Sequence, residues 1–315
     1  RQLREPFRRA RLIIFDKDGT LTHCDGCFGP WMEDLVAKLQ RLQLINRPEQ
    51  LFKVMGYDPV AHAFLSDSPL TRDPNTKSMR RFAEEAWRQT GGTRPLEAFT
   101  EEFMRVTREG PENDIWHIDK AYLTKETLHF CGSRIPELFE ALQRNGTKVC
   151  ICTSDERYLT THTLRTVGLD QYFRMQERGD APASDDLACA DDEDIGHKPL
   201  PDGVLKLCRL AQVPAEQAIM VGDSFTDMLA GLRAGCRELV FVESGGLRAG
   251  DLDAHLRSDA VRSLPGAEDW SACSIVYVRP QEVLGAAQGE AGPAGATVER
   301  RIYAMASVDD MLAEE

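Results

Sequence analysis

The sequence lacks the features of a membrane protein and of a protein that binds nucleic acid. No apolar run approaches the roughly 20 residues that a helix needs to cross a bilayer, which excludes an integral membrane protein. Basic residues are in the minority, since 38 Lys and Arg stand against 51 Asp and Glu and leave a formal net charge of −13. A nucleic-acid-binding face is usually basic. We therefore expect no nucleic-acid partner and no membrane partner, and a local site must attract any anionic ligand.

Two further absences concern the N-terminus and the cysteines. The first 11 residues contain five arginines but no apolar segment of the kind that a secretory signal requires. The nine cysteines show no repeated metal-ligand spacing, and Cys150 and Cys152 lie in an apolar run, as small buried side chains do. This pattern favours a reducing compartment. We expect a cytoplasmic protein, or one of an organellar matrix if the absence of an initial Met means that a targeting segment was removed.

What the sequence does contain is an alternation of apolar strands and amphipathic helices. Residues 12–15 form a short continuous apolar run, the pattern of a strand buried on both faces. Further strands are expected at residues 148–152, 218–221 and 238–242, and helices at 135–145, 158–167, 201–211 and 227–234. Such alternation predicts an α/β fold with a Rossmann-like core, in which helices flank a central parallel sheet.

Residues 23–131 interrupt this alternation. Trp31, Leu35, Leu39 and Leu42 form one helical stripe, and a second helix is expected at residues 79–89. A length of 315 residues favours two domains. We therefore predict an inserted α-helical cap domain at 23–131 and a core domain made of 1–22 and 132–315.

The C-terminal part of the core carries an expected insertion at about residues 250–300. It includes a strand-like stretch at 274–278 and a low-complexity linker at 285–297, and a last helix near 307–313 follows. Earlier in the core, seven acids and no bases lie between Asp180 and Asp194. We interpret that stretch as a solvated loop.

Polar side chains follow three of the predicted strands. Asp16, Thr153 and Asp223 each stand within a residue or two of a strand end. Because ligands of parallel sheets bind beyond the carboxyl ends of the strands, we expect these residues to meet in one crevice. Asp18 is two residues from Asp16, a spacing that puts both carboxylates on one side of an extended backbone. One could serve as nucleophile or metal ligand and the other as proton carrier; the alternative is an Asx turn that caps the strand.

Four ordered motifs make the sequence similar to a known family. Phe-Asp-Lys-Asp-Gly-Thr-Leu at 15–21 resembles the first motif of the haloacid dehalogenase-like hydrolase superfamily, and Thr153 resembles the second. Lys198, in His-Lys-Pro-Leu-Pro-Asp at 197–202, resembles the third. Val-Gly-Asp-Ser-Phe-Thr-Asp at 221–227 resembles the fourth.

The resemblance implies a mechanism and a role for each matching residue. Asp16 would be the nucleophile that forms an aspartyl-phosphate, and Asp18 would be the general acid and base. The implied catalytic residues are Asp16, Asp18, Thr153 and Lys198. The implied phosphate-binding residues are Thr153, Ser154 through its backbone N–H, Lys198, Gly19 and Thr20. The implied ligands of a Mg²⁺ cofactor are Asp16, Asp18 through its carbonyl, Asp223 and Asp227.

The second acid narrows the expected chemistry. Dehalogenase relatives lack an acid at the position of Asp18, and phosphonoacetaldehyde hydrolases carry a non-acidic residue there. Its presence therefore implies a phosphatase. The inserted helical cap resembles the phosphoglycolate phosphatase-like branch, so phosphoglycolate is the leading substrate among small phosphorylated metabolites. A phosphosugar mutase of the β-phosphoglucomutase type and a non-catalytic binding protein stay open as alternatives. We expect a monomer or a homodimer.

The cap offers only weak candidates for substrate contacts. Arg72 and Lys77 could pair with a substrate carboxylate, whereas His62, His117 and His129 are interpreted as ordinary surface or cap residues. Cys24 and Cys27 have the C-x-x-C spacing of a possible redox pair at the entry to the cap.

Overall fold

In the computed structural model, the chain forms two compact units. Unit 1 comprises Arg1–His23 and Phe130–Glu315, and unit 2 comprises Cys24–His129. The predicted boundary of the insert was 23–131, and its role as a cap remains a prediction. The structure describes residues 2–23, 25–65, 68–69, 75–112, 114–175, 185–258, 275–278 and 300–313.

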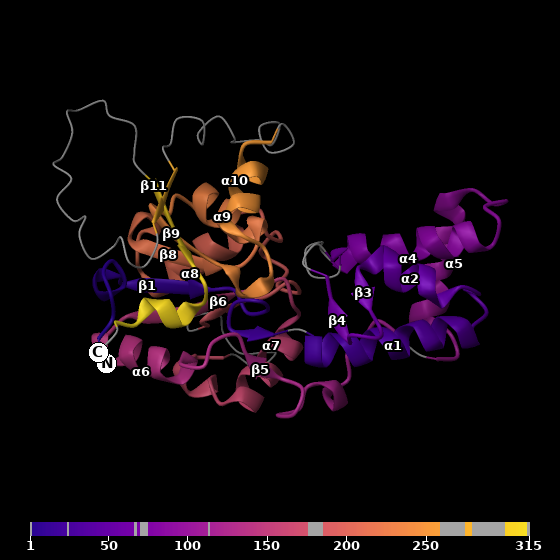
Figure 1. Cartoon of the computed structure of the whole chain (residues 1–315), viewed down its shortest axis with the longest axis horizontal. Coiled ribbons are helices and arrows are strands. Elements are labelled where there is room, and N and C mark those ends of the chain that lie inside the picture. The colour runs from indigo at the N-terminus through magenta and orange to yellow at the C-terminus, as the bar shows by residue number, and fades with distance from the viewer. Residues whose placement is uncertain are drawn as a thin grey trace. The chain divides into compact units, whose positions relative to one another are not determined.

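Unit 1 is built on a parallel sheet (Figure 1). Each neighbouring pair among its seven strands is parallel, in the order β10-β11-β9-β8-β1-β6-β7. The strands are β1 (Leu12–Phe15), β6 (Lys148–Cys152), β7 (Leu187–Ala188), β8 (Ala218–Gly222), β9 (Glu238–Val242), β10 (Ile275–Val278) and β11 (Arg300–Met305). The predicted α/β fold with a central parallel sheet is therefore confirmed.

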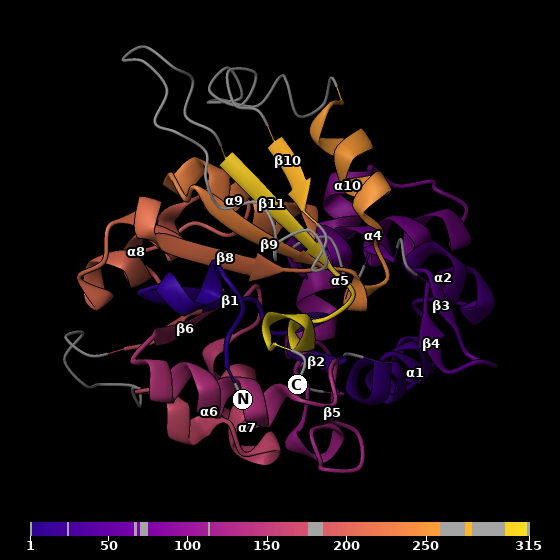
Figure 2. The same ribbon diagram turned by 60° about the vertical axis from the view of Figure 1, so that its left-hand side comes forward.

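Helices cover both faces of this sheet (Figure 2). Ile13 and Phe15 of β1 pack into one core with α6 (Ile135–Asn145) and α7 (Arg157–Val167). Leu12 and Ile14 point to the opposite core, which is shared with the helices on the other side. Those helices are α8 (Asp202–Ala211), α9 (Phe225–Ala234) and α10 (Ala249–Leu256). All four residues of β1 are apolar because alternate side chains enter two different cores. This confirms the prediction of a strand that is buried on both faces.

The C-terminal strand of unit 1 was not predicted. β11 lies between β9 and β10, and Tyr303 on it packs edge-on against Phe7 at 6.0 Å. The expected last helix is a short 3-10 helix, η7 (Val308–Met311). Asp309 on η7 accepts a hydrogen bond from the backbone N–H of Arg134, at the start of α6. The predicted linker at 285–297 lies outside the described residues.

The acidic stretch is only partly the solvated loop that its composition suggested. Asp185 and Asp192 both pair with Arg157 Nη2, at 2.8 and 2.7 Å. Asp186 pairs with Arg174 at 2.7 Å and is buried. Residues 176–184 lie outside the described part. The prediction was wrong for Asp185 and Asp186, because bases from other parts of the chain pair with these acids, which are buried beside β7. Asp191, Glu193 and Asp194 are exposed, as a solvated loop would have them.

Unit 2 is mainly helical, with one short antiparallel hairpin. Its elements are α1 (Asp25–Arg41), α2 (Pro48–Met55), β3 (Tyr57–Asp58), β4 (Ala63–Phe64), α4 (Asn75–Gln89), α5 (Leu96–Glu109) and η2 (Lys120–Tyr122). Phe82, Phe103 and Trp116 form the aromatic centre of this unit, and the Trp116 indole N–H donates to Thr107 Oγ1 at 2.9 Å. Outside this unit, β2 (Thr22–His23) in unit 1 pairs with β5 (His129–Phe130), where the chain returns from unit 2 to unit 1, in a separate two-stranded sheet. Within the described residues, no helix is both long and apolar enough to cross a membrane.

Candidate active site

Three strands deliver the predicted residues to one edge of the sheet. β1 pairs with both β6 and β8, so that Phe15 lies opposite Ile151 and Val221. Asp16 follows directly, and its backbone N–H donates to Val221 O at 2.8 Å. Thr153 follows β6, and Asp223 follows β8. The equal register of the strands therefore places these chain segments side by side.

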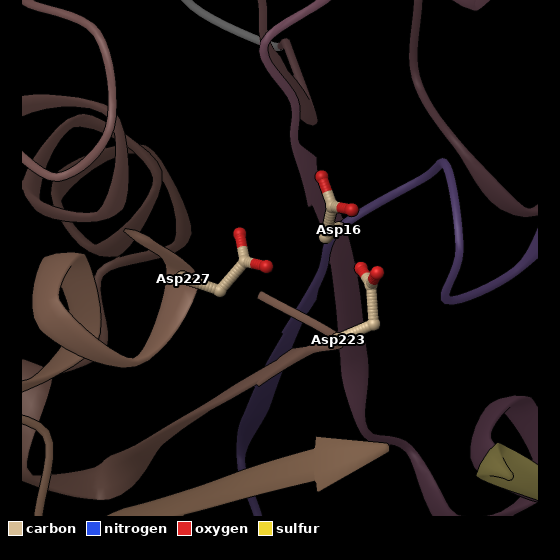
Figure 3. A group of neighbouring side chains, drawn as sticks. All are labelled: Asp16, Asp223 and Asp227. Atoms are coloured by element: carbon tan, nitrogen blue, oxygen red, sulfur yellow. The ribbon is translucent and has the colours of Figure 1, made fainter. Parts of the chain in front are cut away.

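Three carboxylates converge at this edge (Figure 3). Asp16, Asp223 and Asp227 each contribute an oxygen, and these oxygens lie within 4.8 Å of one another. Asp227 comes from the first turn of α9, where it forms a capping box with Ser224 and accepts from the Ser224 backbone N–H at 3.0 Å. An oxygen-only donor set of this kind fits a hard divalent cation such as Mg²⁺.

Lys198 links two of these carboxylates. Its ammonium group lies 2.6 Å from Asp16 Oδ1 and 2.5 Å from Asp227 Oδ1. Burial acts to lower the pKa of Lys198, but the carboxylates of Asp16 and Asp227 outweigh it and raise this pKa well above the usual value. The residue is therefore a buried, permanently charged cation between two acids.

Burial is also the largest influence on the pKa values of Asp16 and Asp223. It raises the pKa of Asp16 to about 6, although the charge of Lys198 opposes the shift. The pKa of Asp223 is raised well above its usual value by burial and then by the charges of Asp16 and Asp227. Concentrated, poorly solvated negative charge of this kind is the electrostatic setting in which a cation binds strongly.

Asp18 lies apart from the three clustered carboxylates. The strand ends at Phe15 and the backbone then turns, with Gly19 N–H donating to Thr22 O at 2.8 Å. The alternation expected of an extended chain therefore does not apply to Asp16 and Asp18. The Asp18 carboxylate instead pairs with Lys17 Nζ at 2.5 Å. Burial raises the pKa of Asp18 to about 7, against the opposing charge of Lys17.

The predicted phosphate-binding residues lie around the same edge. Thr153 is buried and Ser154 beside it is exposed. The buried Thr20 hydroxyl donates to Asp223 Oδ1 at 3.1 Å. Gly19 has a φ of +79°, and a Cβ there would lie 2.6 Å from Asp223 Cγ, so this turn needs a residue without a side chain. In this structure Gly19 and Thr20 both shape the surroundings of Asp223, and their phosphate-binding role remains a prediction.

Sequence reasoning missed four residues of this site. Lys17 is buried and also pairs with Asp155 Oδ2 at 2.9 Å, so one cation serves two acids. Ser244 and Gly245 belong to the 3-10 turn η6 (Glu243–Gly245), and they contact Gly19 and Asp223. The sequence offered one signal, since Lys17 stands between two aspartates. The contacts of Ser244 and Gly245 depend on chain packing alone.

The candidates in unit 2 remain untested or have ordinary contacts. Arg72 and Cys24 lie outside the described residues, and only the backbone of Lys77 is described, within α4. His62 is exposed, and its Nδ1 lies 2.8 Å from Glu33 Oε1. His117 and His129 are exposed, and Cys27 is buried.

Comparison with known proteins identifies the family. A model of haloacid dehalogenase-like hydrolases matches residues 10–235, well over half of the chain. The chain therefore belongs to the haloacid dehalogenase-like hydrolase family, as the four motifs predicted, and the expectation of a hydrolase-family enzyme is confirmed.

Individual relatives match shorter parts. A candidate pyrophosphatase, PpaX, of Caldanaerobacter subterraneus is 36% identical over 105 residues, which cover 33% of this chain and 42% of that protein. A phosphoglycolate phosphatase of Cupriavidus necator is 33% identical over 95 residues, covering 30% and 36%. The matched part is thus less than half the length of either relative. The crystal structure of a phosphonoacetaldehyde hydrolase-like protein from Oleispira antarctica is 21% identical, with a TM-score of 0.48, covering 96% of this chain and 90% of that one.

Proposed function

We propose that this protein is a Mg²⁺-dependent phosphatase that hydrolyses a small-molecule phosphate monoester through an aspartyl-phosphate on Asp16. The proposal rests chiefly on one observation. A buried lysine holds Asp16 beside two further carboxylates, while a second acid, Asp18, stands two residues away and outside that cluster. The nucleophile therefore belongs to the carboxylate cluster that would hold the cation, and the carboxylate that carries the proton stands outside that cluster.

The first step uses Asp16 and Asp18 together. A carboxylate oxygen of Asp16 bonds to phosphorus as the bond from phosphorus to the ester oxygen breaks, and Asp18 gives its proton to the departing alcohol. The pKa of about 7 at Asp18 suits this role, because a group poised near neutral pH can both donate and accept a proton.

The second step regenerates the enzyme. Asp18, now ionised, accepts a proton from a water molecule, whose oxygen bonds to phosphorus as the bond to Asp16 breaks. Inorganic phosphate leaves, and both acids return to their starting states. Lys198 stays charged throughout and stabilises negative charge on Asp16 and on the phosphoryl oxygens.

Asp16, Asp223 and Asp227 would hold the Mg²⁺, with the backbone carbonyl of Asp18 as a further ligand. When bound, the ion supplies positive charge to the phosphoryl oxygens and offsets the mutual repulsion of the acids. Thr20 and Ser224 serve this site by fixing the orientation of Asp223 and Asp227.

Phosphoglycolate is the proposed substrate. The similarity to a phosphoglycolate phosphatase supports this choice, and a helical insert after the first motif fits the same branch. The pyrophosphatase name of the other relative makes inorganic pyrophosphate the natural competitor in a substrate panel.

The test is phosphate release from small phosphate esters and pyrophosphate, with Mg²⁺ and with EDTA, for the wild type and Asp16→Asn. We expect metal-dependent turnover that is fastest with phosphoglycolate and absent in the variant. Mass spectrometry of acid-quenched enzyme should find the phosphoryl group on the peptide that contains Asp16. Turnover that persists in Asp16→Asn would overturn the mechanism. No turnover with any ester would favour the mutase or non-catalytic alternative.

A further inference from the structure

The turn that follows β9 lies against the proposed metal site. It comprises η6 (Glu243–Gly245), and it lies outside the segment that the family model matches. Its two contacts with the site are made by Ser244 and Gly245, and each reaches a residue that surrounds or belongs to the acid cluster.

Gly245 lies directly against Asp223. A Cβ built on Gly245 would stand 2.5 Å from Cγ and 2.8 Å from Cβ of Asp223, and closer still to Oδ2. Gly19 crowds the same carboxylate, since a Cβ there would fall 2.6 Å from Asp223 Cγ and 3.0 Å from its Oδ1. Asp223 therefore lies in a narrow slot between Gly19 and Gly245. A methyl group on either glycine would clash with the Asp223 side chain.

Ser244 fixes the position of that slot. Its hydroxyl donates to the carbonyl oxygen of Gly19 at 2.6 Å, which joins the turn after β9 to the turn after β1. The turn after β1 is closed in its own right, because the backbone N–H of Leu21 donates to Lys17 O at 2.8 Å. The η6 turn thus contacts the turn after β1 through Ser244 and the residue after β8 through Gly245.

We propose that Ser244 and Gly245 are positioning residues for the metal site, and that they set cation affinity by holding Asp223 in the slot. This inference rests on the proposed function, in which Asp223 is a metal ligand. Partners that orient metal ligands typically contribute about 10–100-fold to metal affinity, although they do not touch the ion.

The experiment measures cation binding directly and does not depend on turnover. Full-length metal-free protein is titrated with Mn²⁺, and free Mn²⁺ is followed by electron paramagnetic resonance; Mg²⁺ is titrated in parallel by calorimetry. For Gly245→Ala we expect binding weaker by about 10-fold or more, and for Ser244→Ala a smaller loss. The matched control is Gly250→Ala in α10, where a Cβ has no neighbour within 4 Å and binding should equal that of the wild type.

The outcomes separate the inference from the function on which it rests. If the wild type binds the cation and Gly245→Ala binds it with the same affinity, the inference is overturned and the proposed function stays intact. No cation binding by the wild type would instead reject the metal site itself. If Gly245→Ala does not fold, Ser244→Ala decides, because it removes one hydroxyl and adds no atoms. Wild-type affinity in that variant also rejects the role of the turn.

Kinetics provide a second readout. At saturating substrate, Gly245→Ala should need about 10-fold more Mg²⁺ for half-maximal activity, and excess Mg²⁺ should restore much of the rate. A purely structural role would lower the stability of the metal-free protein and leave the Mg²⁺ requirement unchanged.

Discussion

The two units pair their buried charges differently. In unit 2 the buried acid Glu85 pairs with an exposed base, Arg88, three residues along the same helix. In unit 2, Ser68 and Thr107 are buried, and each hydroxyl donates to a backbone carbonyl, at 2.7 Å to Met55 and at 2.8 Å to Phe103. In unit 1 a buried base, Lys198, meets the buried acid Asp16 across 182 positions of sequence. A buried hydroxyl that bonds to a carbonyl satisfies the backbone and needs no function. Buried charges gathered from distant segments are costly to desolvate, and they are characteristic of a catalytic site.

The largest expected effect comes from removing the buried cation. Lys198→Met leaves Asp16 and Asp227 buried without their shared partner, so we expect a loss of about 3–5 kcal/mol in the free energy of unfolding in EDTA. We also expect a drop in kcat of about 10²–10³-fold, from lost charge stabilisation. Urea denaturation and phosphate release measure the two quantities.

The matched control is Lys38→Met in unit 2. Lys38 pairs with Asp34 at 2.8 Å across four helical positions, and both side chains are partly exposed. Such a pair contributes at most about 1 kcal/mol. If the two lysine variants lost similar amounts of unfolding free energy, the buried charges of unit 1 would be no different in energy from an exposed pair in unit 2.

A loss of stability of the same size, but without a change at the catalytic site, separates the stability of the two units. Phe82→Ala removes a fully buried ring of unit 2, which packs edge-on against Trp116 at 5.3 Å, so we expect a loss of about 3–5 kcal/mol. Hydrogen exchange should show lower protection in unit 2 and unchanged protection in β1 and β8.

Phe139→Ala provides the reciprocal case in unit 1, where this ring packs against Phe15 at 5.3 Å. Its protection loss should fall in the sheet and spare α4 and α5. If each variant lowered the protection of both units equally, the division would be contradicted, because the two units would then unfold as one cooperative body.

The smallest expected effect tests the C-terminal contact. Asp309→Ala removes the carboxylate that accepts from the Arg134 backbone N–H at the start of α6, a loss of about 1 kcal/mol. Asp253→Ala is the control, because its exposed pair with Arg257 in α10 is worth only about 0.2–0.5 kcal/mol. Thermal unfolding compares the two. Equal changes would show that η7 does not stabilise α6.

Residues whose roles depend on local pattern were predictable. Strand β1 and helix α6 have the predicted bounds, because a continuous apolar run and a helical stripe closed by Asn145 and Gly146 are signals within one segment. Asp16 and Asp223 follow from strand ends in the same way. The family resemblance then supplied roles that position alone could not.

Residues whose roles depend on distant contacts were not predictable. Asp185 looked solvated because its cation, Arg157, comes from α7. Strand β11 was not predicted, because its first two residues are arginines, which interrupt the apolar pattern of a buried strand. Gly245 carries no side chain whose chemistry could draw attention, and only packing reveals that its Cα faces Asp223.

The order of strands at one edge of the sheet has a consequence for synthesis on the ribosome. Strand β10 is made before β11, yet β11 is its neighbour in the sheet and separates it from β9. Val278 and Arg300 are separated by 21 residues, a delay of about one to four seconds at usual elongation rates. Throughout that interval β10 has left the peptidyl-transferase centre while the strand that joins it to the sheet does not yet exist. In the finished sheet β11 pairs with β9 and provides the edge on which β10 lies, so β10 cannot join the sheet in this order before β11 has been made.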